Sequence, residues 1–299
     1  MIPRTIVLEH VSKTFGNQVA VGDVDLALAA GECIGLVGHN GAGKTTLIKL
    51  MLGLLRPDSG HISVLGADPT GHQAAQTRRV VGYLPENVAL YPALTGEETL
   101  TFYARLKGIA PVVARPLLAR VGLSAEAIRR SVRTYSKGMR QRLALAQAML
   151  GAPRLLLLDE PTTGLDPALR QSFYEILHDL RDRGATILLS SHQLAELEGE
   201  VDRVVVMNQG RKMADGDLQH LRRLAGITPR VRIRLTSAKA SPPVGWQPVG
   251  DGVWEILSAE EEIADRLRAL PVDVAMVEIL RPTLDNIYAA FLRRPGDAA

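Results

Sequence analysis

The chain has 299 residues, of which 46% are hydrophobic and 22% charged, and its formal net charge is +3. This composition is that of a folded globular protein, and so small a charge argues against nucleic acid as the main partner. The one cysteine, Cys33, excludes a disulfide framework and fits a reducing compartment. We find neither a signal-peptide pattern nor a run of ~20 apolar residues. We therefore expect a protein without a membrane span of its own.

The first part of the chain combines strand patterns with one helical pattern. Residues 4–15 and 18–28 alternate apolar with polar side chains, which predicts two strands. The apolar run at 32–37 predicts a third strand, and this run stops at a cluster of glycines. A helical pattern begins at Lys44, and a further strand is expected at 62–65.

The middle of the chain is mostly helical. Residues 95–98 have the Thr-x-x-Glu spacing of a capping box, so a helix is expected to begin there, and the helical character continues to about residue 151. Apolar runs at 155–158 and 186–189 predict strands, with a helix at about 167–183 between them. Strands that alternate with helices are typical of a mainly parallel sheet covered by helices.

The sequence changes character beyond about residue 228. Apolar residues there alternate with arginines, and a stretch rich in proline and glycine follows. We expect a main domain at 1–227 and a small α/β accessory domain at 228–299, which is large enough to pack by itself. The elements expected in the accessory domain are a strand at 231–235, a strand near Val253, a helix at 260–270, a strand at 272–280 and a helix from Thr283.

A phosphate-binding loop is indicated by the sequence GHNGAGKT at residues 38–45, which fits the Gly-x-x-x-x-Gly-Lys-Thr pattern. Its glycines let backbone N–H groups surround phosphates, and the following helix points its positive end at them. An ordinary glycine turn is the alternative, but the strand before and the helix after favour the phosphate loop. Lys44 is expected to reach the β- and γ-phosphates, and the Thr45 hydroxyl to bind Mg²⁺. The nucleotide-binding residues predicted here are Gly38, Asn40, Gly41, Gly43, Lys44, Thr45 and Thr46.

An acidic pair, Asp159 and Glu160, follows the apolar run at 155–158. A buried strand can present such a pair only at its end, where the phosphates would lie. We expect Asp159 to hold Mg²⁺ and Glu160 to polarise the attacking water. Many strands end in aspartate, so this motif is informative only together with the phosphate loop.

A third motif lies at residues 135–142, just before the acidic strand, and reads YSKGMRQR. Ser136 is the expected N-cap of a helix whose open N–H groups suit a γ-phosphate. The helix that begins at Ser136 and the phosphate loop of the same chain cannot easily contact the same phosphate group. A head-to-tail dimer, in which Ser136 of each subunit closes the other's site, is the natural solution. A plain capped helix remains the alternative.

With these motifs the chain resembles the ATP-binding-cassette (ABC) ATPases over about residues 4–225. The resemblance implies an α/β fold with a RecA-like P-loop core, an antiparallel β layer and a helical subdomain near 87–150. It also implies ATP and Mg²⁺ as cofactors, a second copy in an ATP-sandwiched homodimer, and a multi-span membrane permease served from the cytoplasmic face of the bacterial inner membrane. The site residues that the resemblance adds are Phe15 on the adenine, Ser136 and Gly138 in the signature loop, Asp166 in the D-loop, Glu86 near Mg²⁺ and the water, and His192 on the γ-phosphate.

Two positions depart from the family's usual pattern. Glu86 stands in the loop at 83–86 where a glutamine is usual, and the signature reads YSKGM in place of LSGGQ. Glu86 still offers an oxygen to Mg²⁺, but it adds negative charge near the γ-phosphate. We expect the partner subunit's Lys137 to offset part of that charge.

Several long stretches, among them GHNGAGKTTLIKLMLGLL and GYLPENVALYPALTGEETL, resemble the ATPases of nitrous oxide reductase maturation systems. That narrower resemblance implies a role in copper or sulfur supply and a periplasmic accessory protein as a further partner. The chain has no Cys-x-x-Cys or His-x-x-Met pair, so it should supply energy only. Alternatives are the ATPase of another export system of this subgroup, a soluble ATPase acting on ribosomes or DNA, and an ATP-dependent clamp that does not hydrolyse. The basic residues at 211–234 are interrupted by acids and lack aromatics, so a solvated face is favoured. An edge near lipid headgroups or a partner subunit is the first alternative, and nucleic-acid binding is the least favoured.

Overall fold

The computed structural model describes residues 3–236, 244–250, 252–270 and 274–293. The chain forms two compact units, Met1–Asp217 and Leu218–Ala299. The boundary therefore lies earlier than the expected division between 227 and 228. The reason is helix α8 (Leu218–Ala225), which packs against α10 (Leu284–Arg293) and so belongs to the second unit.

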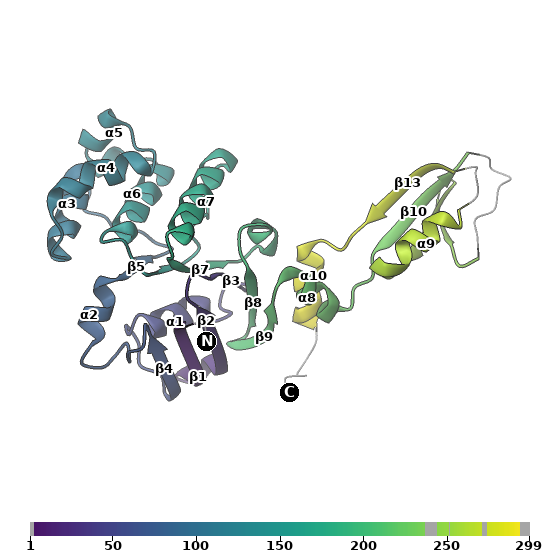
Figure 1. Ribbon diagram of the computed structural model, residues 1–299, viewed down its shortest axis with the longest axis horizontal. Helices are drawn as coiled ribbons and strands as arrows, with labels where there is room; N and C mark the ends of the chain where they lie inside the picture. Colours follow the sequence, from purple (N-terminus) through teal and green to yellow (C-terminus); the bar gives the residue numbers. More distant parts are fainter. Residues whose placement is uncertain (1–2, 237–243, 251, 271–273, 294–299) are drawn as a thin grey trace. The chain divides into compact units, whose positions relative to one another are not determined.

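The first unit is built on a mostly parallel six-stranded sheet (Figure 1). Nearly every side chain of its inner strands is buried, which explains their continuous apolar runs. Only the last strand runs antiparallel to its neighbour. In spatial order the strands are β5 (Val81–Leu84), β6 (Leu155–Leu158), β7 (Thr186–Ser191), β3 (Cys33–Val37), β8 (Arg203–Asn208) and β9 (Arg211–Gly216).

A three-stranded antiparallel layer covers one side of this sheet. Its order is β2 (Gln18–Ala29), β1 (Arg4–Phe15) and β4 (Ser59–Val64). The alternating sequence pattern predicts the strands β1 and β2. Helix α1 (Lys44–Met51) buries Leu47, Ile48 and Leu50 in a core shared by both sheets. This packing fixes the first turn of α1 against the end of β3.

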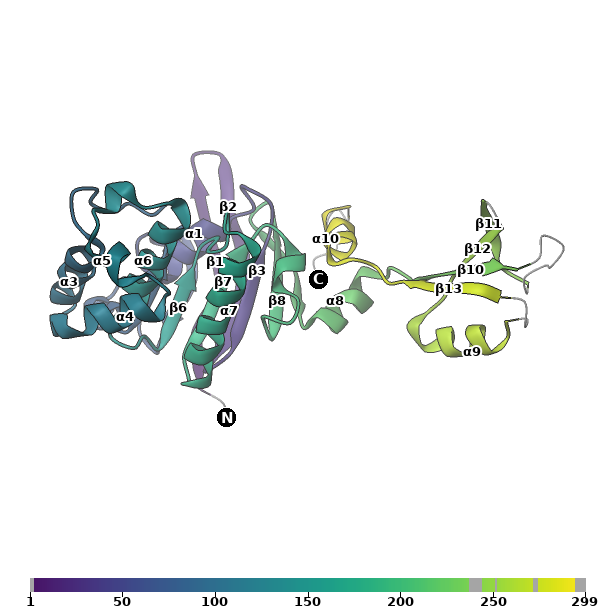
Figure 2. The same cartoon turned by 90° about the horizontal axis from the view of Figure 1, so that it is seen from above.

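Helices occupy the other side of the sheet (Figures 1 and 2). The capping box of α3 (Gly96–Leu106) is confirmed, because Thr95 Oγ1 accepts from the N–H of Glu98 and Glu98 accepts from the N–H of Thr95. Helix α7 (Pro167–Asp182) ends before Gly184, as predicted. The helical subdomain contains α3, α4 (Ala114–Arg120), α5 (Ala125–Arg129) and α6 (Lys137–Met149), with 3-10 turns at Pro111–Val113 and Val132–Thr134. A short helix, α2 (Ala74–Arg79), precedes β5.

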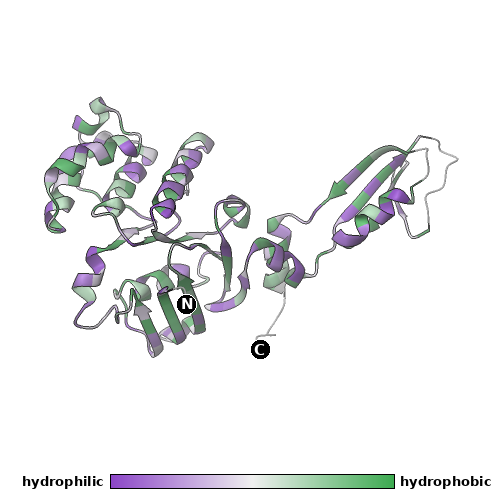
Figure 3. Cartoon of the chain, in the orientation of Figure 1, coloured by the Kyte–Doolittle hydropathy of each residue, from purple (hydrophilic) through white to green (hydrophobic). Residues whose placement is uncertain are grey.

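The second unit contains a four-stranded antiparallel sheet, whose order is β11 (Gln247–Gly250), β12 (Val253–Leu257), β10 (Arg230–Leu235) and β13 (Val274–Leu280). Its core consists of apolar side chains on one face of the sheet together with Ile263 of helix α9 (Ile263–Arg268). Along β10 arginines alternate with buried apolar residues, and Figure 3 shows this alternation of hydrophilic and hydrophobic residues. The arginines therefore lie on the face opposite the core, as predicted. Part of the Pro/Gly-rich stretch at 241–252 and residues 272–273 lie outside the described residues.

Parallel strands place their carboxyl ends at a common edge, so the loops after β3, β6 and β7 meet there. In the described part of the chain, no helix combines the length and the apolar character that crossing a bilayer requires.

Candidate functional site

The loop between β3 and α1 has the backbone of a phosphate cradle. Gly41 and Gly43 have φ angles of 87° and 101°, a left-handed conformation that favours glycine. A Cβ at Gly43 would also collide with the carbonyl oxygen of Ala20, and one at Gly38 would lie 2.7 Å from the carbonyl oxygen of Met207. Helix α1 begins at Lys44 without a side-chain cap. Its first N–H groups are therefore open to an anion.

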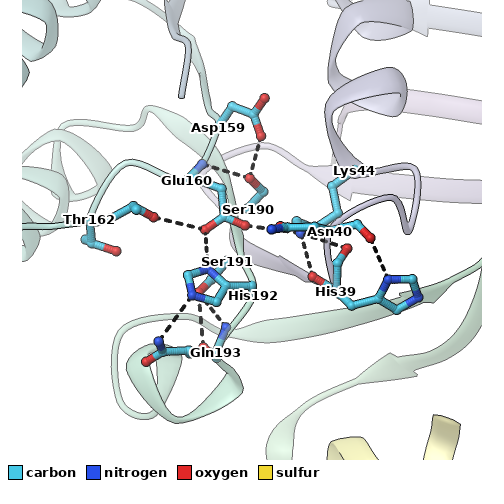
Figure 4. Close-up of polar contacts among 12 residues, drawn as sticks. His39, Asn40, Lys44, Asp159, Glu160, Thr162, Ser190, Ser191, His192 and Gln193 are labelled. Carbon is cyan, nitrogen blue, oxygen red and sulfur yellow. Dashed lines mark hydrogen bonds and ion pairs between the residues drawn. The ribbon is translucent and has the colours of Figure 1, made fainter. Parts of the chain in front are cut away.

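Lys44 is buried, with 5% of its surface exposed, and its amino group turns back into the loop. Lys44 Nζ donates to the carbonyl oxygen of Gly38 at 2.5 Å and lies 3.1 Å from Glu160 Oε1 (Figure 4). Glu160 Oε1 is itself buried and has no hydrogen-bond partner among the described residues. A bound phosphate would compete with Glu160 for the Lys44 ammonium group and so free the Glu160 carboxylate to face the reacting atoms.

Asp159 and Glu160 lie directly after β6 and are tied to the end of β7 by one hydroxyl group. Ser190 Oγ donates to Asp159 Oδ1 at 2.7 Å and accepts from the N–H of Glu160 at 2.9 Å. Asp159 is 1% exposed and Ser190 is fully buried. This pair of hydrogen bonds sets the angle at which both acids leave the sheet. Glu160 has a φ of 49°, an uncommon conformation for a non-glycine residue that tends to occur at functional sites.

His192 follows β7 and holds the other oxygen of the Glu160 carboxylate. His192 Nδ1 donates to Glu160 Oε2 at 2.8 Å, and the side chain of His192 is partly exposed at the surface of the site. Burial raises the pKa of Glu160, but the hydrogen bond from His192 and the charge of Lys44 outweigh it, so the net pKa is lower than usual. Glu160 is therefore ionised at neutral pH and can accept a proton.

Two of the remaining predicted site residues, Glu86 and Phe15, are exposed. Glu86 follows β5 and is exposed, and no hydrogen bond or ion pair involves it in the part of the chain that the structure describes. Phe15, at the end of β1, is 49% exposed, with Lys13 Nζ 5.6 Å from its ring centroid. Asp159 and the Thr45 hydroxyl suit Mg²⁺, which binds a few oxygen ligands together with substrate phosphates. An exposed aromatic ring such as that of Phe15 is available to stack on a base.

The predicted signature loop forms the start of α6. Ser136 is the N-cap and accepts from the N–H of Met139 at 3.2 Å, and both Ser136 and Lys137 are exposed. The Lys137 side chain packs directly against Gly164 of the same chain. A Cβ at Gly164 would collide with the Lys137 side chain. Asp166 is the N-cap of α7, because its carboxylate accepts from the N–H of Leu169 at 2.9 Å. Asp166 thus has a structural role in addition to any contact with nucleotide.

Two further residues connect the motifs and have no local sequence signature. Gln141 Nε2 of α6 donates to the carbonyl oxygen of Pro161 at 2.8 Å, and this buried bond links the signature helix to the loop after Glu160. Ser190 makes the bonds described above. A serine at the end of a buried strand and a glutamine on a helix are common in sequences. The hydrogen bonds of Ser190 and Gln141 are therefore seen only in the folded structure.

Comparisons with known proteins agree with this geometry. The family model "ABC transporter" matches residues 21–163. The chain is 42% identical to "Nod factor export ATP-binding protein I" of Burkholderia lata, over 71% of this chain and 70% of that protein. It is 35% identical to a daunorubicin resistance ATP-binding protein of Streptomyces coeruleorubidus, over 99% of this chain and 98% of that protein.

A solved structure of the ATP-binding subunit of an ABC transporter is 34% identical and superposes with a TM-score of 0.68, covering 74% of this chain and 93% of the other. The fold is therefore that of the RecA-like ABC cassettes, and ATP with Mg²⁺ is the ligand of the site. The chain belongs to the ABC transporter family, as an ATP-binding subunit that hydrolyses ATP.

Proposed function

We propose that this chain powers an export system by hydrolysing ATP between two of its own copies and driving a separate membrane permease. The observation that carries the proposal is the contact of Lys44, Glu160 and His192 at the carboxyl ends of β3, β6 and β7. These residues combine a phosphate-binding cation, an ionised base and a group that orients the base. Export is favoured because the relatives with similar sequences are named for Nod factor export and drug resistance.

Each site residue has a distinct proposed task in hydrolysis. Glu160 accepts a proton from the attacking water, and His192 holds the Glu160 carboxylate in place and contacts the γ-phosphate. Lys44 binds the β- and γ-phosphates, while the open N–H groups of α1 bind the remaining phosphate oxygens. Mg²⁺, when bound, neutralises charge on the phosphates, and Thr45, Asp159 and Glu86 are its proposed protein ligands. The proposed contacts to the rest of the nucleotide come from Phe15, Asn40 and Thr46.

The second half of each site is proposed to come from another copy. Ser136 is exposed at the start of an α-helix and is available to a γ-phosphate bound elsewhere. In a head-to-tail pair, the partner's Ser136 and the partner's Gly138 close the site over the γ-phosphate, with Asp166 lining the contact between copies. Lys137 leans over Gly164 of its own chain, so its proposed action on the partner's Glu86 requires the side chain to move.

The proposed permease contact lies on the helical subdomain. Tyr91, Phe102 and Leu106 are 56%, 39% and 67% exposed, and the rings of Tyr91 and Phe102 pack edge to face at 5.9 Å. Adjacent exposed aromatic and aliphatic side chains are typical of a protein-binding surface. Docking there places the chain peripherally on the cytoplasmic face of the bacterial inner membrane.

The narrower prediction, a role in nitrous oxide reductase maturation with a periplasmic accessory protein, rests on the sequence blocks alone. Among the described residues, no group of three or more histidine, cysteine, aspartate or glutamate side chains is arranged to hold a metal ion. Under this prediction the chain would power copper or sulfur supply without itself carrying copper. The chain would supply energy in the same way to a permease that exports an organic compound. The identity of the permease therefore decides between copper or sulfur supply and organic export.

The test is affinity purification of the tagged chain from detergent-solubilised membranes of its own organism, with mass spectrometry of the bound proteins. A multi-span membrane protein is expected, and the variant Phe102→Glu/Leu106→Glu should lose it while keeping ATPase activity. Leu257→Glu, at an equally exposed apolar residue of the second unit, is the matched control and should retain it. A copper-enzyme assembly factor among the bound proteins supports the narrower role. Ribosomal or DNA-repair proteins in place of a permease would overturn the transport proposal.

A further inference from the structure

Strand β13 lies at the edge of the second unit's sheet, and among the residues that the structure describes β10 is its one partner strand. Residues 275–278, in the middle of this strand, are all exposed. An edge strand presents a row of unpaired N–H and C=O groups that can pair with another strand. The exposed run AMVE contains one charge and neither proline nor glycine. The devices that usually prevent edge pairing are therefore largely missing from β13.

The opposite edge of the same sheet is built differently. Strand β11 has four residues, including Pro248 and Gly250, and its register with β12 shifts between these two residues. Short length, proline and irregular register all discourage pairing with a further strand. The β11 edge therefore discourages an additional strand, whereas the β13 edge can pair with one.

The inner face of β13 also carries apolar surface that the unit leaves uncovered. Val277 pairs with Ile233 of β10, which is fully buried, yet Val277 is 45% exposed. Both side chains lie on the face that α9 covers, because paired residues in an antiparallel sheet point to the same side. The core layer therefore ends at β13 with an exposed valine. An additional strand beside β13 would extend this layer.

We propose that β13 pairs antiparallel with β13 of a second copy, around a two-fold axis at Val277. Val277 is the midpoint of Val274–Leu280, so this register pairs all seven residues of the strand with their counterparts. Pairing Val277 with itself keeps the inner faces of both sheets on one side and brings the two exposed valines into contact. A register shifted by one residue between the chains would instead join the inner face of one sheet to the outer face of the other.

The outer face supports the same register through charge. Glu278 and Arg234 are both exposed, and neither has an ion-pair or hydrogen-bond partner among the residues that the structure describes. In the two-fold pair, Glu278 lies opposite the partner's Met276, which is itself beside the partner's Arg234. Two strand spacings separate Glu278 from the partner's Arg234, about 10 Å between Cα atoms. Within its own chain Glu278 lies opposite Arg232, which forms an ion pair with Glu255. Two long side chains can span the longer distance, so Glu278 is able to pair with the partner's Arg234.

This contact needs no nucleotide, and it is separate from the ATP sites in the first unit. It would keep two copies together while the ATP-dependent contacts open and close. The ATP sites would then reassemble within one pair of copies at a high effective concentration.

The test is disulfide crosslinking of the full-length chain in EDTA and without nucleotide. Cys33 is the one native cysteine, it is buried, and burial raises the pKa of its thiol to about 12, so it will not react. The variant Val277→Cys should form a crosslinked dimer under mild oxidation, because the axis places this residue beside its own counterpart. Val249→Cys, on β11 and 50% exposed, is the matched control and should remain monomeric on a denaturing gel. Equal crosslinking of both variants, or none at position 277, would overturn the proposal.

A second variant separates this contact from ATP-dependent pairing. Val277→Lys puts two lysines face to face, which should weaken nucleotide-free association by about tenfold or more in analytical ultracentrifugation. Val249→Lys should leave association unchanged, and circular dichroism confirms that both variants fold. In the Glu160→Gln background with ATP, Val277→Lys should still dimerise. If ATP-dependent pairing persists while nucleotide-free association is unaffected by Val277→Lys, the β13 contact is wrong and the ATP-sandwiched dimer stands.

Discussion

The variant Glu160→Gln should bind ATP with near-normal affinity and hydrolyse it about a thousandfold more slowly. Glutamine keeps the shape of the side chain, but it cannot accept a proton from the attacking water. The lowered pKa of Glu160 shows that the carboxylate is the form held by Lys44 and His192 at neutral pH. Steady-state phosphate release measures the turnover, and isothermal titration calorimetry measures ATP binding.

The matched control for this variant is Glu126→Gln, in the first turn of α5 and exposed. It removes an equal charge from the same unit, so it shows whether net charge alone affects turnover. The control should retain full activity. Near-normal turnover in Glu160→Gln would show that Glu160 is not the base and that the water is activated by another group, with His192 the next candidate.

The variant Lys44→Met should lower ATP affinity by about a hundredfold, because methionine cannot form the charge-assisted hydrogen bonds that the Lys44 ammonium group donates to the phosphates. It should also destabilise the nucleotide-free protein, by about 3 kcal/mol, since the buried Glu160 loses its nearest positive charge. Glu160 has a depressed pKa, so it contributes stability above its unfolded pKa, and this contribution disappears as the pH falls through the folded pKa. Without Lys44, the pKa of Glu160 rises and part of that contribution is lost.

The stability effect has its own test. The double variant Lys44→Met/Glu160→Gln has no unpaired carboxylate, so it should regain much of the stability that Lys44→Met loses, while remaining unable to hydrolyse ATP. Lys49→Met, on the exposed side of the same helix, is the control and should change neither affinity nor stability. Thermal unfolding of the four proteins at neutral pH measures the effect. A double variant no more stable than Lys44→Met would mean that Lys44 does not stabilise the buried carboxylate.

Much of the first unit could be predicted from the sequence, because its motifs are local. The glycines of the phosphate loop and the capping box at Thr95 depend on neighbouring residues only, so their geometry follows from short segments. The strands β1, β2, β3, β6 and β7 were predicted from alternation or apolar runs. Strands β5, β9 and β11 were not, because they are short or lie in polar surroundings where periodicity is weak. Strand β8 was also missed, although residues 204–207 form a buried apolar run.

The residues of the site could be predicted from the sequence, but the hydrogen bonds that connect them could not. Ser190 joins Asp159 to the N–H of Glu160 only because β6 and β7 are neighbours in the sheet, and strand order is a property of the whole fold. The two compact units meet after Asp217, earlier in the chain than the predicted boundary, for the same reason. Helix α8 joins the second unit through α10, which is far away in the sequence. Long-range packing decided each of these features.

The claim that two copies share each ATP site is tested most directly by mixed dimers. Chains carrying Glu160→Gln and chains carrying Ser136→Arg should each be inactive, and they are co-expressed with different tags and purified through both. If the signature helix of one copy acts on the ATP of the other, every mixed dimer contains one intact site, and about half of the wild-type turnover returns. If Ser136 acts on the site of its own chain, the mixed dimers contain no intact site and stay as inactive as their parents, and the account of a shared site is wrong.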